Sequence, residues 1–165
     1  MTSANTLNFN GQHFTPSEFP EGVLSHMSDK VVLALFDVRN TLPKTHALYP
    51  SPLYGAHVRD DLTNSRHNTR GDSRLSDATD FFCRRSHLPL VYQEVMKHLD
   101  INGAGFYKGS VYRGATDLWV MVHIDTRPSE EKIFWTANKV GGDYQYTYLS
   151  TDPKKYFKTL MELCL

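Results

Sequence analysis

The side chains best suited to chemistry lie in two short segments that are well separated in the chain. The first, Ser65-Arg66-His67, is followed after a polar insert by a run that contains Asp80, and the second contains His123. Two imidazoles and a carboxylate, each beside or within an apolar strand-like run, can hold a zinc ion and leave one coordination position open for water. The sequence therefore predicts a zinc site formed by His67, Asp80 and His123, provided that the three side chains converge.

The second segment, residues 119–125, alternates like a β-strand. Residues two apart in a strand share a face, so His123 and Asp125 are expected on one face, while Val122 and Ile124 point into the core. This arrangement allows a ligand beside a general base, or a ligand beside the carboxylate that orients it. A purely structural histidine–aspartate pair is the alternative.

The first segment adds a carboxylate that enters an apolar run. Asp80 precedes Phe81-Phe82, and burying a carboxylate is costly unless it is paired or bound to a metal. His67 lies upstream in a polar loop that could fold over this strand. The alternative is that Asp80 only caps a turn and that His67 is exposed.

These residues resemble the zinc peptidases of bacterial cell-wall metabolism, a family that includes D-alanyl-D-alanine carboxypeptidases, related phage endolysins and the hedgehog signalling fold. The family's first motif is Ser-x-His-x-x-Gly-x-Ala-x-Asp. Ser65-Arg66-His67 matches its start and Ala78-Thr79-Asp80 matches its end. Both candidate ligands of the first segment, His67 and Asp80, therefore fall on matched positions of the motif.

One branch of the family has a second motif: Gly-Tyr-Tyr, then an aromatic residue with Val-His-Val-Asp, then a tryptophan. Gly105-Phe106-Tyr107, Val122-His123-Ile124-Asp125 and Phe134-Trp135 match it in order. Upstream, residues 14–19 match an early Phe-x-x-x-Glu-Phe, and residues 54–59 loosely match a Ser-Gly-Tyr-Arg strand. The resemblance thus spans residues 14–136.

The chain departs from the family pattern in the first motif. The family's histidine and aspartate are seven positions apart, whereas here they stand at positions 67 and 80. The extra residues, around 69–74, must loop out if both side chains are to reach one metal. Ser76 also stands where the motif has glycine. His57 is the reserve ligand should His67 not reach the site.

The resemblance implies that zinc binds His67, Asp80 and His123 and activates a water molecule, whose proton a carboxylate base accepts. Many relatives have a glutamate three residues before the last histidine, but that position is Val120 here. Asp125 is the first candidate for the base and Asp117 the second, because both share the face of His123 in an unbroken strand.

The resemblance also implies a substrate. Arg59 would hold a substrate carboxylate, and Ser65 belongs with it among the substrate-binding residues. We expect a zinc metallopeptidase of the endolysin type, as found in bacteriophages, that cuts the peptidoglycan stem peptide as an endopeptidase or a carboxypeptidase. A non-catalytic, zinc-stabilised binding module on the same fold is one alternative, and a protein that binds no metal is another.

Composition narrows the classes of partner. The formal net charge of the 165 residues is zero, which gives no reason to expect binding to nucleic acid or to a membrane. The two cysteines are expected to be free thiols. The N-terminus lacks the features of a signal peptide, so we expect synthesis in the cytoplasm and action on the cell wall after release. We expect a monomer.

The pattern of elements predicts one α+β domain over residues 1–165, which begins with an extended segment at 1–13. We expect a central antiparallel or mixed sheet with helices packed mainly on one side. Ser28 should cap a first helix, Ser86 a second that contains Pro89, and Asp152 a third. Strands are predicted at residues 54–58, 78–83, 103–108, 118–125, 133–136 and 144–149.

Overall fold

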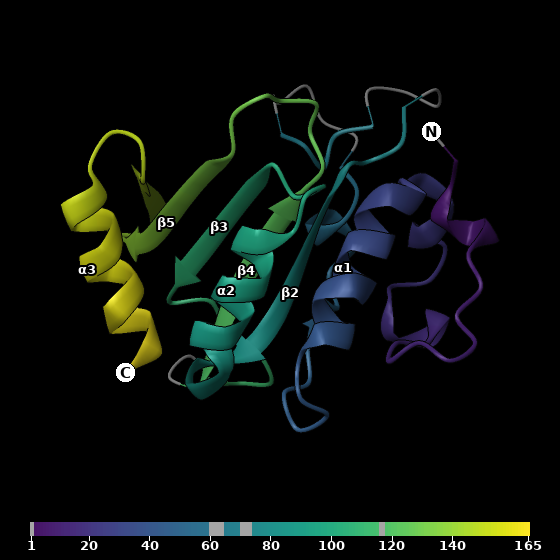
Figure 1. Ribbon diagram of the computed structural model, residues 1–165, viewed down its shortest axis with the longest axis horizontal. Helices are drawn as coiled ribbons and strands as arrows, with labels where there is room; N and C mark the ends of the chain where they lie inside the picture. Colours follow the sequence, from purple (N-terminus) through teal and green to yellow (C-terminus); the bar gives the residue numbers. More distant parts are fainter. Residues whose placement is uncertain (1, 60–64, 70–73, 116–117) are drawn as a thin grey trace.

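The computed structural model describes residues 2–59, 65–69, 74–115 and 118–165. It shows one six-stranded sheet in the order β1-β2-β4-β3-β5-β6, in which only β3 and β5 pair in parallel (Figure 1). The strands are β1 (Tyr49–Pro50), β2 (Ala78–Arg84), β3 (Gly103–Lys108), β4 (Trp119–Asp125), β5 (Ile133–Val140) and β6 (Asp143–Tyr148). The helices are α1 (Asp29–Thr41), α2 (Leu88–Lys97) and α3 (Pro153–Cys164). The predicted α+β fold with a mixed sheet is confirmed.

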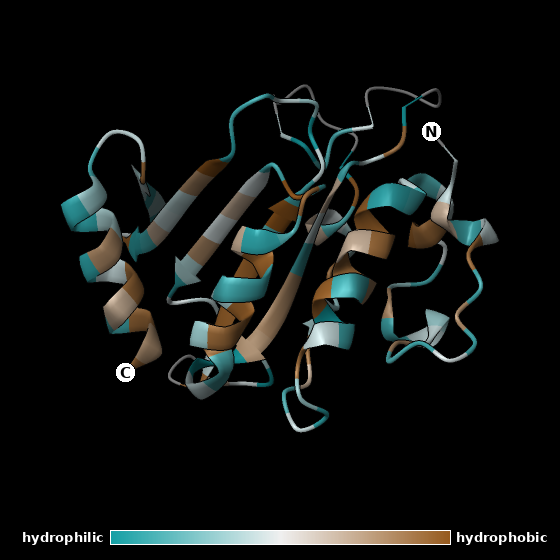
Figure 2. Cartoon of the chain, viewed as in Figure 1, coloured by the Kyte–Doolittle hydropathy of each residue, from teal (hydrophilic) through white to brown (hydrophobic). Residues whose placement is uncertain are grey.

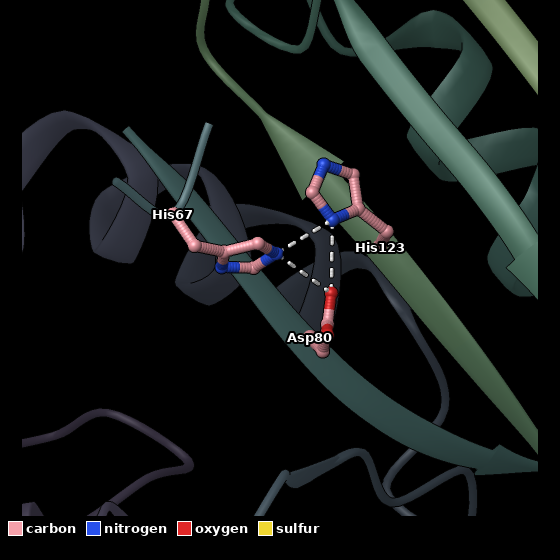
Figure 3. Close-up of side chains that lie close together, drawn as sticks. All are labelled: His67, Asp80 and His123. Atoms are coloured by element: carbon pink, nitrogen blue, oxygen red, sulfur yellow. Dashed lines mark hydrogen bonds and ion pairs between the residues drawn. The ribbon is translucent and has the colours of Figure 1, made fainter. Parts of the chain in front are cut away.

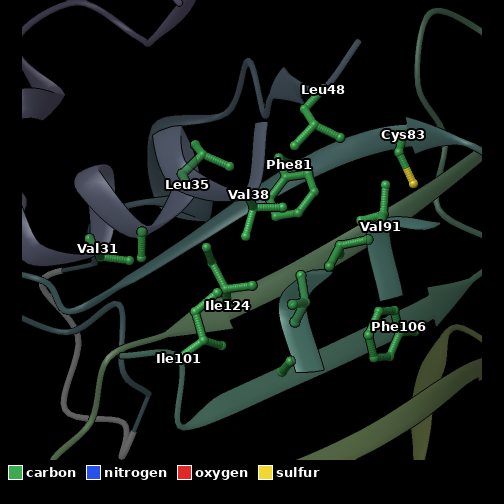
Figure 4. Close-up of a cluster of buried hydrophobic side chains, with 14 of the residues drawn as sticks. Val31, Leu35, Val38, Leu48, Phe81, Cys83, Val91, Ile101, Phe106 and Ile124 are labelled. Atoms are coloured by element: carbon green, nitrogen blue, oxygen red, sulfur yellow. The ribbon is translucent and has the colours of Figure 1, made fainter. Parts of the chain in front are cut away.

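The three α-helices cover one face of this sheet, which we call the helix face (Figure 1). Alternate residues of β2 and β4, such as Phe81 and Ile124, are buried there against α1 residues such as Leu35 (Figure 4). Figure 2 shows the corresponding pattern, with hydrophobic residues on the visible parts of β4 and in bands along α1 and α2. No helix among the described residues has the length and apolar character that crossing a membrane requires.

Two of the three α-helices begin at the capping residue that the sequence predicts. The Ser28 hydroxyl accepts a hydrogen bond from the Lys30 amide at the start of α1, and Asp152 accepts one from the Lys155 amide at the start of α3. At α2 the capping position is His87, and Ser86 lies within the short 3-10 helix η5 (Arg85–His87). The prediction that Ser86 caps α2 is therefore wrong by one residue.

The N-terminal segment packs against α1. Phe9 and Phe14 contact Phe36 of that helix, with ring centroids 5.0 and 5.7 Å apart, so α1 is covered on the side that the sheet does not reach. The segment predicted to be extended contains a short 3-10 helix, η1 (Ala4–Thr6), and a turn in which the Gln12 amide donates to the Phe9 carbonyl. Two further 3-10 helices, η2 (Pro16–Glu18) and η3 (Val23–His26), lead from it into α1.

The strand predicted at residues 54–58 is wrong. The chain forms the 3-10 helix η4 (Tyr54–Ala56), because the Tyr54 carbonyl accepts hydrogen bonds from the amides of His57 and Val58. The edge strand of the sheet at this point is β1, a few residues earlier. Arg59 reaches the site from an isolated parallel bridge with Asn68 and not from a regular strand.

The second face of the sheet, which we call the open face, carries the alternate side chains of the same strands. At one end of β2 and β4 it is covered by a small aromatic cluster in which Phe82 stacks on Tyr112 at 4.5 Å and Trp119 packs beside them. The other end carries Asp80 and His123. One end of the open face is thus covered by aromatic side chains. At the other end, polar side chains line a cavity.

Candidate metal centre

Three side chains converge on the open face (Figure 3). Asp80 and His123 are directly paired residues of β2 and β4, and His67 reaches over them from the preceding loop. Asp80 Oδ1 lies 2.9 Å from His123 Nδ1 and 3.4 Å from His67 Nε2, and the two nitrogens are 3.1 Å apart. Three ligands about 2.0–2.2 Å from a tetrahedral zinc ion stand roughly 3.3 Å from one another. The predicted convergence of His67, Asp80 and His123 is confirmed.

The hydrogen bonds around His123 indicate what belongs between these atoms. Its Nε2 lies 3.1 Å from the carboxylate of Asp125, which can only accept, so Nε2 carries a proton. In the neutral ring Nδ1 then carries no proton, and its lone pair faces the Asp80 oxygen. Two acceptors at that separation repel each other unless a proton or a cation lies between them. The donor set therefore fits a metal ion.

The pKa values follow the same logic. Burial would lower the pKa of His123, but its hydrogen bonds to Asp125 and Asp80 raise it to about 9. Burial would raise the pKa of Asp80, yet His67 and His123 outweigh that effect and hold it well below its usual range. In the metal-free protein a proton on His123 thus takes the place that a cation would fill.

The loop that carries His67 is tied to the scaffold on both sides of the ligand. The Arg59 amide donates to the His67 carbonyl at 2.7 Å, and the Thr69 amide donates to the Arg59 carbonyl at 2.9 Å. Arg66 reaches Asp77 at 3.5 Å, next to the start of β2. These contacts hold the imidazole of His67 over the sheet. Residues 70–73 of the insert lie outside the described residues.

Asp125 lies on the far side of His123 from the other two ligands. It is fully buried, and its oxygens bind His123 and the guanidinium of Arg127, which donates from Nε at 2.6 Å and also from Nη2. Burial would raise the pKa of Asp125, but Arg127 and His123 outweigh that effect and lower it. Gly103 on β3 makes room, since a Cβ there would overlap the carboxylate. The geometry is that of a carboxylate that orients a metal-binding histidine.

Trp135 forms the floor beside His123. Its indole lies over Gly105, where a Cβ would overlap the ring, and its centroid is 5.2 Å from that of His123. The indole N–H donates to the Tyr107 hydroxyl at 3.2 Å. Burial, with the nearby Asp80, raises the pKa of Tyr107, so its phenol stays neutral and keeps a proton to donate.

These residues line one large cavity of about 900 Å³. Four arginines and five aromatic residues are among the described residues that line it. The lining residues are Arg59, Ser65, Arg66, His67, Arg74, Asp80, Tyr107, Met121, His123, Arg127, Ile133, Trp135, Tyr144, Tyr146 and Tyr148. Among the described residues, Asp80 is the one carboxylate that lines this cavity.

The other predicted site residues have different places. Arg59 and Ser65 both line the cavity, where the sequence placed substrate-binding groups. Asp117 lies outside the described residues. His57, the reserve ligand, is buried and is not one of the three converging residues: its Nε2 donates to the Ser51 carbonyl at 2.8 Å and its Nδ1 accepts from Thr79 at 2.7 Å. Because both ring nitrogens are occupied, His57 has a structural role.

Sequence reasoning missed Arg127 and the site role of Tyr107. Arg127 follows Asp125 by two residues, so alternation along the strand could have suggested that the two share a side. For Tyr107 the signal was its place in the Gly-Phe-Tyr run of the resemblance. Comparison of the chain with protein-family models, curated proteins and solved structures gives no match.

Proposed function

We propose that this protein is a zinc-dependent peptidase that hydrolyses a peptide bond in the peptidoglycan stem peptide. The observation that carries the proposal is the convergence of His67 Nε2, Asp80 Oδ1 and His123 Nδ1 at the floor of a cavity. Two imidazoles and one carboxylate suit zinc and leave a position open for water or substrate. When bound there, zinc would polarise a scissile carbonyl and lower the pKa of a water molecule towards neutrality.

The protein's own residues prepare this site. Asp125, held by Arg127, keeps the Nδ1 lone pair of His123 directed at the ion position. Tyr107 offers a neutral phenol at the cavity wall that can donate a hydrogen bond to a developing oxyanion. Trp135 excludes water from one side of His123.

The charges of the cavity support an anionic substrate. Arg59 lines it, and Arg66 and Arg74 both pair with the buried Asp77, at 3.5 and 3.7 Å. Among the described residues that line the cavity, four are arginines and one is a carboxylate, so positive charge exceeds negative charge there. A stem peptide carries free carboxylates that guanidinium groups can bind in a bidentate manner.

A second candidate, a zinc-stabilised binding module without turnover, is favoured by one observation. Val120, at the position of the family glutamate, is fully buried and points to the helix face, and no described residue supplies a second cavity carboxylate. In this candidate the same cavity binds the stem peptide but does not cleave it.

Two measurements test the proposal. Metal analysis of protein purified without a histidine tag or chelator should give one zinc per chain, and less than one zinc per several chains would contradict it. Incubation of the zinc-loaded protein with purified peptidoglycan, and with a peptide ending in D-alanyl-D-alanine, should release new amino termini or D-alanine. Zinc at full occupancy with peptide binding but no cleavage would support the binding module. Asp80→Asn is the variant expected to lose both zinc and turnover.

A further inference from the structure

The cavity extends well beyond the metal centre, and its far side is aromatic. We call Tyr107, Trp135, Tyr144, Tyr146 and Tyr148 the aromatic wall. Trp135 connects this wall to the metal centre, because its ring lies beside His123 on one side and 6.3 Å from Tyr148 on the other. Tyr107 contacts Tyr144 at 5.1 Å and Tyr146 at 6.3 Å. The wall is therefore continuous with the proposed site.

Strand register explains why these rings gather. Tyr148 pairs with Trp135 across β5 and β6, and Tyr146 pairs with Ala137, so alternate residues of β6 all face the open side of the sheet. Tyr146 is 50% exposed and Tyr148 is 42% exposed. A row of half-exposed rings in a cavity is a binding surface more than a core.

We propose that the aromatic wall binds a carbohydrate chain, the glycan to which the cleaved peptide is attached. This inference rests on the proposed function, because it assigns the second part of the same substrate. A sugar ring presents C–H groups on its face, which pack on aromatic rings, and hydroxyl groups at its rim, which bond to polar groups such as phenols. Tyrosine supplies both surfaces from one side chain.

Two cations lie over rings of this wall, Lys139 over Tyr144 at 5.9 Å and Arg127 over Trp135, and they do not form the row of cations that a polyanionic chain needs. Lys139 is the single cation in the sequence of β5 and β6, and Arg127, which stacks over Trp135 at 5.8 Å, is neutralised by Asp125. A single-stranded nucleic acid would need a track of cations for its phosphates, and the formal net charge of the whole chain is zero. Arg59, Arg66 and Arg74 come instead from the segments around His67, where a peptide carboxylate would bind.

The dimensions suit a branched substrate of this kind. Three strand spacings, about 14 Å, separate β4 with its metal ligand from β6 with its tyrosines. A cavity of about 900 Å³ is at the upper end of the range for small ligands, so it has room for more than one peptide bond. The glycan would lie over β5 and β6 while its peptide branch crosses β3 to the metal centre.

The test uses the tetramer of β-1,4-linked N-acetylglucosamine as the probe. Its binding to the full chain is measured by calorimetry and by NMR chemical-shift changes, with zinc and after treatment with a chelator. We expect binding in both states, weakened about tenfold by Tyr146→Ala and by Tyr148→Ala, whereas Tyr148→Phe keeps the ring and retains binding. Phe157→Ala is the matched control, since Phe157 is 45% exposed on α3, and it should leave binding unchanged.

The outcomes separate this inference from the proposed function. If the tetramer does not bind at millimolar concentration, or if the tyrosine variants bind it as well as the parent protein, the carbohydrate assignment is overturned even when stem peptides are cleaved. If the wall instead binds a sugar-free stem peptide with the same dependence on Tyr146 and Tyr148, it is a peptide subsite and the assignment is also overturned. Tetramer binding without turnover would contradict only the peptidase.

Discussion

The indole of Trp135 occupies the space above Gly105, on the strand between its own and that of His123. β3 lies between β4 and β5 in the sheet, so without a side chain at this position the ring can cross the strand and reach the histidine. A β-carbon at residue 105 would overlap the ring. The glycine thus determines how closely the floor of the cavity approaches the metal ligands.

Gly105→Ala should therefore displace Trp135 and loosen the metal centre. We expect a loss of about 1–3 kcal/mol in the free energy of unfolding, because the added methyl overpacks a filled site, together with weaker zinc binding. Denaturant unfolding and a competitive zinc titration measure the two effects. Gly55→Ala is the control, since nothing lies near a Cβ there. An unchanged zinc affinity in Gly105→Ala would contradict the role assigned to the ring.

The Asp125–Arg127 pair should influence metal affinity through its hydrogen bond to the ligand His123. Asp125→Asn removes the charge that holds the His123 ring in its tautomer, and we expect a loss of about 10–100-fold in zinc affinity. Arg127→Ala should have a smaller effect in the same direction, because it leaves a buried carboxylate without its main partner. If Asp125→Asn keeps its zinc and loses only turnover, Asp125 is the general base that the sequence suggested.

The metal-free protein should lose stability as pH rises. The pKa of His123 is about 9 in the folded chain against an ordinary value of 6.5. The folded state thus holds this proton more tightly than the unfolded state, and the resulting stability is complete below pH 6.5 and is lost as the pH rises through 9. Thermal unfolding in excess chelator between pH 6 and 10 measures the effect. In His123→Gln the slope over this window should largely disappear.

Zinc should stabilise the fold, because the site does not exist in the unfolded chain. At a free concentration one hundred times the dissociation constant, the gain is about 2.7 kcal/mol in the free energy of unfolding. Melting curves at increasing zinc concentration measure it. His67→Ala and Asp80→Asn should abolish the gain, and a gain that persists in both variants would place the ion elsewhere.

His57 provides a contrasting case. Its ring is buried and hydrogen-bonded through both nitrogens to Ser51 and Thr79. His57→Ala should destabilise the protein by about 1–3 kcal/mol, because it leaves buried partners unsatisfied, while the stoichiometry of zinc stays unchanged. Metal analysis of the variant distinguishes this role from that of a ligand.

Local patterns were sufficient for much of the fold. Period-two alternation identified β4 and the face of His123, and the apolar run after Asp80 indicated β2. His67 was chosen because it lies in a polar loop upstream of this strand and matches the start of the Ser-x-His motif. The bend at η4 was missed because the apolar residues after Leu53 resemble a strand, whereas the Tyr54 carbonyl closes a turn there. The position of Trp135 could not be derived from spacing. It depends on the parallel pairing of β3 with β5, and β4 lies between these two strands in the sequence.

The direct pairing of Asp80 with His123 makes the metal centre a reporter of strand register. Sliding β2 by one residue along β4 would turn its carboxylate towards the helices and separate the two ligands. A chain with misaligned strands therefore could not hold the ion, and a bound metal would select molecules in which the central strands are correctly aligned.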